Sequence, residues 1–501
     1  MNKRIPSIAL LTSLLLTTLA SCGGSDTPGG DTTVSDTTTS APETTSQFVT
    51  DELPDDLNLG GEQVNILIGD YNSAYFGDMY AEEANGSRLN DAIFNTIRSV
   101  EERLNADLVY TSESYTYSGL PAFQGKVQAT IMAGDDSIDL LFDATNYTTQ
   151  MMEGDYFANL ADTKYIDIDK PWYNQSIRAN IANDYVHFLS GQFAIGNIKN
   201  AFGIYFNADL YEALGKTEDL YTLVDEGKWT VNKLQELVKD SYADLNGDTS
   251  PDTSDRYGIT FGDGNKYLGF ITSLDVSIFQ KTKDGYEFTY DSERALDAVS
   301  WLCSFINENE NVMFASAGAN GNANVDDQIS SGGGNYVSKA FMEGRAVFTC
   351  SLIADAATII PEITFDYGLL PYPKWDEEQE EYQSMLQRSC YTLIPVSANV
   401  DNASAVLEAL SSESYRSLIP EYVEITLKTR YALDDNMSRM FDLIVNNIVY
   451  DPGEIYNIYL DAPSGEFRNL VMQNNSSWAS HMASLKTNLI TKMAEIVEKG
   501  K

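Results

Sequence analysis

Histidine is scarce in this chain of 501 residues, where only His187 and His481 occur, far apart in the sequence. There is no HExxH metal motif, no GxSxG nucleophile turn, no phosphate-binding P-loop and no GxGxxG fingerprint. These absences argue against the enzymes that such motifs identify. An enzyme that degrades glycans with a pair of carboxylates stays open, because 74 acidic residues supply many pairs and no pair stands out.

Basic residues are also few. The sequence has 32 lysines and arginines against 74 aspartates and glutamates, a formal net charge of −42. A chain of this charge repels phosphate backbones and anionic lipid surfaces, so we expect no nucleic-acid partner. The same charge keeps an exposed protein soluble and favours neutral or cationic ligands over anionic ones.

Cysteine is limited to Cys22, Cys303, Cys350 and Cys390. The last three form an odd set without CxxC spacing, which excludes a disulfide framework among them. Two of them lie in apolar runs and the third lies beside a predicted strand, so we expect all three to be buried as small hydrophobic side chains.

Long hydrophobic runs are missing except near the N-terminus. Residues 5–20 are apolar, follow Lys3 and Arg4, and fall short of the roughly 20 residues that a spanning helix needs. The "LASC" that ends at Cys22 resembles a bacterial lipobox, which implies a signal peptide over residues 1–21 and lipidation, as by palmitate, of Cys22. An ordinary secretory signal with an unrelated cysteine is the alternative.

Residues 22–50 contain almost no apolar side chains and are rich in Gly, Ser, Thr, Asp and Pro. Such a segment cannot bury enough surface to offset the entropy lost on ordering. We predict a disordered tether that holds a folded part at the extracellular face of the cell membrane.

The folded part begins with a pattern of alternating strands and helices. An apolar run at 61–70 predicts a strand, and Leu89, Ile93, Ile97, Val100 and Leu104 form one helical face. A second strand, a second helix and a third strand at 138–142 follow. This β-α-β-α-β order is typical of a parallel α/β sheet covered by helices.

Later segments add helices with clear start signals. Thr230 is a good N-cap because its hydroxyl can accept an orphan backbone N–H. Trp229 and Leu234 flank it as a hydrophobic staple, so we assign Trp229 to packing. Another helix is predicted from about Ala208, and the last hundred residues are helical.

Four motifs carry a family resemblance in a fixed order: "AFGIYFNADLYEALG", "LVDEGKWTVNKLQELV", "FMEGRAVFTC" and "FDYGLLPYPKWDEEQEEYQS". Together they resemble the bacterial extracellular solute-binding proteins of family 1, the carbohydrate-type lipoproteins of ABC importers. The resemblance covers most of residues 61–501. It implies an α/β, two-lobed type II periplasmic-binding-protein fold with a hinge and an interlobe cleft.

The same resemblance predicts how the chain is divided and what it does. Residues 51–200 plus 341–398 would form the first lobe, and 201–340 plus 399–501 the second. A monomer without a required cofactor would bind a small-molecule ligand, an oligosaccharide, and present it to ABC transporter permease subunits. A peptide or another small polar solute is the alternative ligand. A purely adhesive or structural surface lipoprotein is the alternative function.

Sugars bind to aromatic platforms surrounded by Asp, Asn, Gln and Arg, and ligands of open α/β sheets gather at the carboxyl ends of strands. Tyr71 and Asn72 follow the first strand, and three candidates follow the third. Trp172 and Tyr173 lie in "KPWYNQS", where relatives often have an aromatic contact. The predicted ligand-binding residues are Tyr71, Asn72, Asp143, Asn146, Tyr147, Trp172, Tyr173, Tyr336, Asp355 and Trp375.

The segment "DLNGDTSPDTSD" has the spacing of a calcium loop, with oxygen side chains at positions 1, 3, 5, 7, 9 and 12. Position 6 is Thr249 rather than Gly, and position 12 is an Asp rather than the usual Glu. A structural Ca²⁺ is one interpretation, and an acidic solvated loop with Asx turns is the other. The predicted ligands are Asp244, Asn246, Asp248, Ser250, Asp252 and Asp255.

Overall fold

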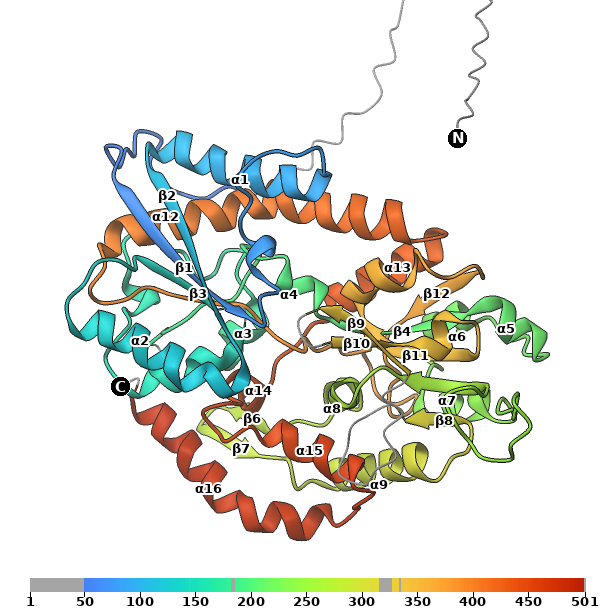
Figure 1. Ribbon diagram of the computed structural model, residues 1–501. Helices are drawn as coiled ribbons and strands as arrows, with labels where there is room; N and C mark the ends of the chain where they lie inside the picture. Colours follow the sequence, from blue (N-terminus) through green and yellow to red (C-terminus); the bar gives the residue numbers. More distant parts are fainter. Residues whose placement is uncertain (1–48, 144, 182–184, 315–326, 333–334, 500–501) are drawn as a thin grey trace, which may run out of the picture. The chain divides into compact units, whose positions relative to one another are not determined.

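The computed structural model describes residues 49–499 apart from 144, 182–184, 315–326 and 333–334 (Figure 1). The predicted signal peptide, Cys22 and all but the last two residues of the predicted tether lie outside the described residues. Within the described part, no helix has both the length and the apolar content to cross a membrane.

The first sheet confirms the predicted β-α-β-α-β order. Its strand order is β13-β3-β1-β2, and β1 pairs in parallel with both β2 and β3, whereas β13 is antiparallel to β3. Its strands are β1 (Gln63–Tyr71), β2 (Asp107–Tyr115), β3 (Leu140–Asp143) and β13 (Tyr391–Leu393).

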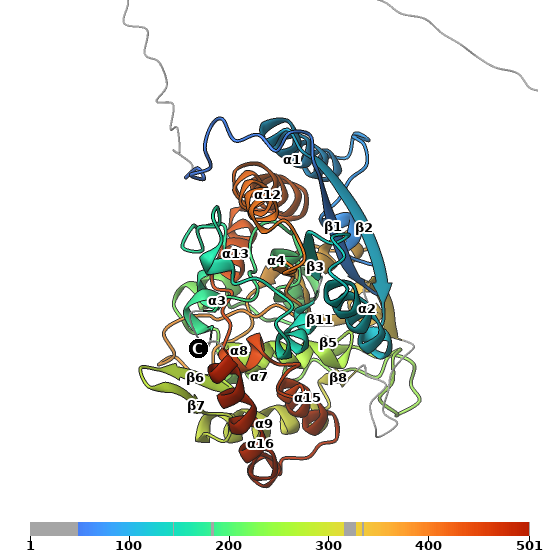
Figure 2. The same ribbon diagram turned by 90° about the vertical axis from the view of Figure 1, so that its left-hand side faces the viewer.

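Two helices link the parallel strands, α1 (Arg88–Leu104) and α2 (Leu120–Met132). Ile93, Ile97, Val100 and Leu104 of α1 are buried, as the predicted helical face requires. Helix α1 packs against α12 (Val400–Glu413), and the two lie side by side in Figures 1 and 2.

The second sheet has the order β12-β4-β11-β5-β8. Every residue of β4, β5, β11 and β12 is buried, as expected for strands covered on both faces. Two ribbons lie outside the sheet, β6 with β7 and β9 with β10. The strands are β4 (Phe202–Asn207), β5 (Tyr257–Phe261), β6 (Phe279–Thr282), β7 (Gly285–Phe288), β8 (Val312–Phe314), β9 (Gln328–Gly332), β10 (Asn335–Ser338), β11 (Ala346–Leu352) and β12 (Tyr367–Leu370).

The pairing corrects the predicted lobe limits in two segments. Strands β11 and β12 pair with β4 in the second sheet, although 341–398 was expected in the first lobe; only β13 of that stretch joins the first sheet. Helix α12 packs on α1 of the first lobe, although 399–501 was expected in the second. Local periodicity predicts that a strand or helix forms, but its partner is chosen by long-range packing.

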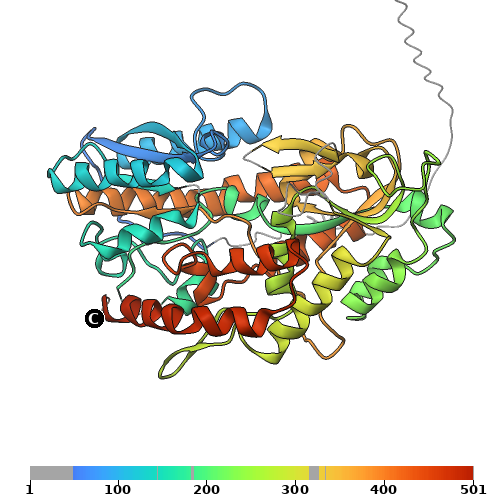
Figure 3. The same ribbon diagram turned by 60° about the horizontal axis from the view of Figure 1, so that its bottom comes forward.

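Several of the remaining helices contact strands of the second sheet, and others pack on one another. Helices α15 and α16 pack against α9, and the chain's C-terminal helix runs along this face in Figure 3. The helices are α3 (Gln175–Asn180), α4 (Gly196–Lys199), α5 (Ala208–Ala213), α6 (Leu220–Asp225), α7 (Val231–Val238), α8 (Gly269–Ser273), α9 (Glu293–Asn307), α10 (Lys339–Met342), α11 (Ala356–Ile359), α13 (Asp435–Asn446), α14 (Pro452–Ile455), α15 (Pro463–Met472) and α16 (Trp478–Lys499).

Three local predictions are confirmed. Thr230 caps α7 and its hydroxyl accepts the backbone N–H of Lys233. Trp229 is fully buried and donates its indole N–H to the carbonyl of Pro371 at 2.8 Å. The three cysteines at 303, 350 and 390 are buried, and none forms a disulfide within the described residues.

Candidate functional site

The parallel strands of the first sheet end together and bring their following residues to one edge. Tyr71 at the end of β1 is in register with Tyr115 at the end of β2, and Asp143 ends β3 beside Gly69. Asn72, Tyr117 and Tyr147 come just after these strand ends. Of the residues predicted at this edge, Tyr71, Asn72 and Tyr147 line one pocket. Their contact with a ligand stays a prediction.

The pocket has a volume of about 340 Å³ and is formed by segments far apart in the chain. One wall comes from the strand ends of the first sheet, and the others come from the turn after β5, the connection from β12 to β13, and residues 450–468. It is lined by Tyr71, Asn72, Tyr117, Tyr147, Asn265, Leu268, Met385, Leu386, Gln387, Arg388, Ser389, Tyr450, Glu454, Asn457, Ile458, Ala462, Ser464, Gly465 and Arg468.

Tyrosine rings form the wall on the side of the first sheet. Tyr147 packs edge-on against Tyr71 at 5.5 Å between ring centroids and against Tyr117 at 5.8 Å. Tyr71 is only 8% exposed, whereas Tyr117 is 59% exposed. The buried rings hold the wall in place, and the exposed ring of Tyr117 is free to stack on an apolar face of a ligand.

Asp143 lies beneath this wall rather than in the pocket. Its side chain is fully buried and accepts the hydroxyl proton of Tyr115 at 2.5 Å and the backbone N–H of Thr145 at 3.2 Å. Burial raises the pKa of Asp143 to about 7. The predicted ligand contact is therefore wrong in this structure, and Asp143 instead fixes the ends of β2 and β3. Asn146 opens the 3-10 helix that follows, and its side chain lies outside the described residues.

Two arginines line the other walls of the pocket. The Arg388 guanidinium lies 4.9 Å from the centre of the Tyr71 ring, and its Nη1 donates to Tyr75 Oη and Asn335 Oδ1, both at 3.2 Å. Arg468 donates from Nη1 to Asn265 Oδ1 at 2.7 Å. These contacts orient both charged groups at the pocket.

Glu454, on α14, is the one acidic side chain among the described residues that line the pocket. Burial, with a smaller contribution from the carboxylate of Asp451, raises the pKa of Glu454. A protonated carboxyl can donate as well as accept a hydrogen bond, which suits a ligand hydroxyl. Ser389 and Tyr450, whose hydroxyls lie 2.8 Å apart, add two more polar groups to the same wall.

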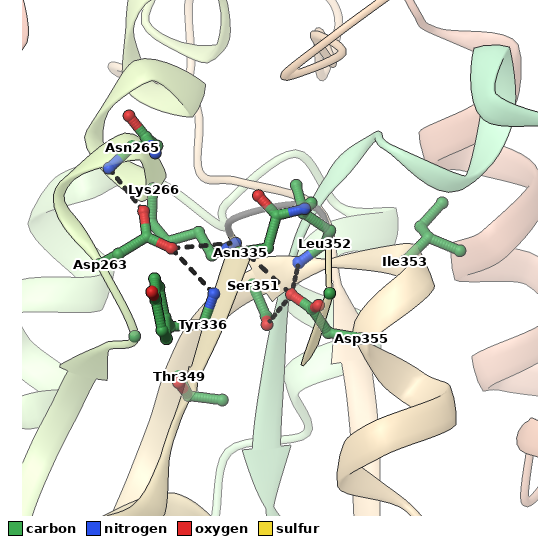
Figure 4. Close-up of polar contacts among 12 residues, drawn as sticks. Asp263, Asn265, Lys266, Asn335, Tyr336, Thr349, Ser351, Leu352, Ile353 and Asp355 are labelled. Carbon is green, nitrogen blue, oxygen red and sulfur yellow. Dashed lines mark hydrogen bonds and ion pairs between the residues drawn. The ribbon is translucent and has the colours of Figure 1, made fainter. Parts of the chain in front are cut away.

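Asp355 belongs to a buried cluster that Tyr336 joins through its backbone N–H (Figure 4). Neither residue lines the pocket. Lys266 is completely buried and lies 3.5 Å from Asp355 Oδ2 and 3.7 Å from Asp263 Oδ2. Asp355 also accepts from Ser351 Oγ at 2.6 Å and from the backbone N–H of Leu352 at 2.9 Å.

Asp263 connects this cluster to the pocket. It accepts the backbone N–H of Tyr336 at 3.1 Å and that of Asn265 at 2.7 Å, and it caps the 3-10 helix at Gly264–Leu268 (Figure 4). Asn265 in turn holds Arg468. The predicted direct role of Tyr336 and Asp355 in ligand contact is replaced by one of support.

Trp172 and Tyr173 lie in the hydrophobic core, so their prediction as ligand contacts is wrong. They are 0% and 2% exposed, and both donate to Glu408 Oε2, Tyr173 at 2.7 Å and Trp172 at 3.4 Å. Burial raises the pKa of Glu408 to about 7. Aromatic residues serve equally well in cores and in sugar sites, and the short motif alone does not distinguish the two.

Trp375 lines a separate surface hollow of about 880 Å³, together with Trp301 and Phe305. The guanidinium of Arg294 lies 5.1 Å from the centre of the Trp375 ring. The structure does not bring Trp375 together with the tyrosine wall. A further hollow of about 900 Å³ is lined by seven carboxylates and two lysines, the latter at Lys228 and Lys233.

The sequence prediction missed the residues from the C-terminal half. Arg388, Glu454 and Arg468 occupy positions without a recognisable motif, and only the fold places them opposite the strand ends. For the two arginines the single sequence signal is their charge, because basic residues are few in this chain. Tyr117 was within reach of the prediction, since it follows the second strand directly.

The predicted calcium loop is built mainly from Asx-type turns. Asp244 accepts the backbone N–H groups of Gly247 and Thr249, and buried Asp255 accepts that of Leu245. The amide of Asn246 donates to both Asp248 and Asp252 at 3.1 Å, so three predicted ligands do lie together. Nowhere in the described residues do three His, Cys, Asp or Glu side chains form a ready-made metal site.

Solved structures with the same fold include sugar-binding proteins. The cyclic α-maltosyl-1,6-maltose binding protein from Arthrobacter globiformis matches with a TM-score of 0.53 at 11% identity, over 87% of this chain and 100% of that one. An ABC substrate-binding protein from Listeria monocytogenes, in complex with cycloalternan, gives 0.52 at 13% identity, over 87% and 99%. The GacH receptor of Streptomyces glaucescens gives 0.51 at 12% identity, over 88% and 100%.

The chain therefore has the two-lobed type II periplasmic-binding-protein fold that the motifs predicted. Neither a protein-family model nor a curated protein matches the sequence.

Proposed function

We propose that this chain is a solute-binding lipoprotein that captures an oligosaccharide for an ABC importer. One observation carries the proposal: the pocket at the strand ends is walled by tyrosines on one side and by amide, hydroxyl and arginine groups on the others. Sugars present apolar C–H faces and a rim of hydroxyls. The tyrosines of the pocket suit the apolar faces, and its polar groups suit the hydroxyls. The solved proteins of the same fold include ones described as binding cyclic maltosyl-maltose and cycloalternan.

The pocket is lined by segments of both lobes, which supports a closing motion as part of the proposed mechanism. Tyr71, Tyr117 and Tyr147 belong to one lobe, whereas Asn265 and Arg468 lie on segments that pack with the other. A ligand in contact with both walls favours the closed arrangement by its differential affinity for it. The closed form would be the one presented to permease subunits at the extracellular face of the membrane, with Cys22 as the lipid anchor.

We propose that the ligand leaves the pocket chemically unchanged. The pocket contains one carboxyl group, Glu454, among its described lining residues, whereas glycoside hydrolysis uses two that flank the bond. A peptide or another small polar solute is the alternative ligand, and a glycan-degrading enzyme the alternative function. Incubation with each candidate oligosaccharide, followed by chromatography, separates binding from cleavage, because an enzyme would release shorter products.

The exposed tyrosine gives a direct test of the pocket. Calorimetric titration of the wild type with a panel of neutral and acidic oligosaccharides should identify a ligand. Tyr117→Ala should then weaken its binding by about 1–2 kcal/mol, which is about 5- to 30-fold, because a stacking face is lost. Tyr117→Phe should retain most of the affinity.

Tyr165→Ala is the matched control, since Tyr165 is half-buried and does not line the pocket. It should leave the affinity unchanged. Equal loss in Tyr117→Ala and Tyr165→Ala, or binding of no oligosaccharide in the panel, would contradict the proposed site.

We also propose that residues 244–255 hold a structural Ca²⁺. The proximity of Asn246, Asp248 and Asp252 supports it, although part of the loop's oxygen capacity is already used by backbone N–H groups. Calcium at 100 times its dissociation constant should raise the free energy of unfolding by about 2.7 kcal/mol. The double variant Asp248→Asn, Asp252→Asn should lose this effect. A calorimetric titration of the wild type without heat, together with an unchanged unfolding midpoint, would contradict the site.

A further inference from the structure

The pocket has the opposite charge balance from the rest of the chain. Overall the sequence carries 74 acidic and 32 basic residues. The pocket is lined by Arg388 and Arg468, with Glu454 as the one described acidic residue. The acidic surface hollow has seven carboxylates against two lysines, so a cationic lining is a local property of this pocket.

Neither arginine has a carboxylate partner in the part of the chain that the structure describes. Within the described residues, Arg388 and Arg468 form no ion pair. Arg388 donates from Nη1 to both Tyr75 and Asn335. Arg468 has a buried Nε without a hydrogen-bond partner among the described residues. A half-buried guanidinium without a carboxylate partner is costly, and an anionic ligand group would supply that partner.

Burial and the carboxylate of Asp451 raise the pKa of Glu454 and so favour its neutral form, which weakens its opposition to the two arginine charges. The many surface carboxylates do not cancel these charges. At physiological ionic strength the screening length is about 8 Å, so distant surface charges act weakly, while groups inside a narrow pocket act through a poorly screened medium. The local arginines therefore outweigh the acidic composition that, taken alone, favours neutral or cationic ligands.

We propose that the ligand is an acidic oligosaccharide, whose carboxylate pairs with the guanidinium groups of Arg388 and Arg468 while its sugar rings contact the tyrosine wall. This inference rests on the proposed function and names its substrate class. The planar fork of arginine matches a carboxylate with two parallel hydrogen bonds, which a lysine would not offer. A uronic acid residue supplies such a carboxylate; a sulfate ester would supply the same negative charge in another shape.

The test compares oligosaccharides that differ in whether they carry an acidic group and in which acidic group it is. Three sets of oligosaccharides are titrated into the protein. The first is rich in uronic acids, the second is the same set after chemical reduction of its carboxyl groups, and the third is sulfated and of the same length. We expect the uronic acid form to bind, its carboxyl-reduced form to bind about 10- to 100-fold more weakly, and the affinity for the acid form to fall as salt is added. Stronger binding of the sulfated form would assign the charge to a sulfate and overturn the carboxylate assignment.

Variants test the residues. Arg388→Gln and Arg468→Gln should each lower the affinity for the acid form about 10- to 100-fold and leave the affinity for the reduced form nearly unchanged. Arg88→Gln removes the same charge from an exposed position outside the pocket and should have no effect. Arg388→Lys keeps the positive charge but removes the planar fork of the guanidinium. Thermal unfolding verifies that each variant is folded.

The outcomes separate this inference from the proposed function. Equal binding of the acid and reduced forms, unaffected by either Arg→Gln change, would overturn the acidic ligand and leave a sugar-binding protein. Binding of none of the three forms and of no neutral oligosaccharide would overturn both.

Discussion

Trp172→Ala is expected to lower the free energy of unfolding by about 3–5 kcal/mol, the usual cost of removing a large aromatic side chain from a core. The indole is completely buried between Tyr173, at 6.4 Å between ring centroids, and Tyr415, at 6.1 Å. The change also removes one of the donors to the buried carboxyl of Glu408. Denaturant unfolding, followed by intrinsic fluorescence and by circular dichroism, measures the loss.

Two further variants serve as comparisons. Trp172→Phe keeps most of the ring and removes only the N–H, so it should cost less than the alanine change. Trp375→Ala removes a half-buried tryptophan from the surface hollow and should cost about 1 kcal/mol or less. If Trp172→Ala left unfolding unchanged but abolished sugar binding, the packing role would be wrong and a ligand platform would be right.

The parts of the site that follow directly from local sequence were predictable. A buried strand followed by Tyr71 and Asn72, and another followed by Tyr147, place these residues at one edge of the sheet, because parallel strands end together. The capped start of α7 was also predictable from local sequence, because Thr230 and the backbone that it caps are neighbours in the sequence.

The parts that depend on distant packing were not predictable. Arg388 and Arg468 line the same pocket as the tyrosines only because the connection from β12 to β13 and helix α15 reach it. Trp172 was misassigned because its burial depends on Glu408 and Tyr415, more than 230 residues away. Strands β11 and β12 were assigned to the wrong lobe because the sequence of an apolar strand does not specify which strand it pairs with.

Lys266→Met is expected to lower the free energy of unfolding by about 3–5 kcal/mol, because it leaves the buried carboxylates of Asp263 and Asp355 without their cation. Methionine fills a similar volume, so the loss reports charge rather than a cavity. Lys283→Met is the matched control: Lys283 is almost fully exposed beside Asp284, and its replacement should change the stability by less than about 0.5 kcal/mol.

A double-mutant cycle with Asp355→Asn tests the origin of the loss. The asparagine oxygen can still accept the backbone N–H of Leu352, while the charge that Lys266 compensates is gone. The double variant should therefore be more stable than the sum of the two single changes predicts, by about 1–3 kcal/mol of coupling. Because Asp263 holds Asn265 and Asn265 holds Arg468, Lys266→Met should also weaken ligand binding. Additive stability changes together with unaltered binding would mean that the buried cluster supports neither the second lobe nor the pocket wall built on it.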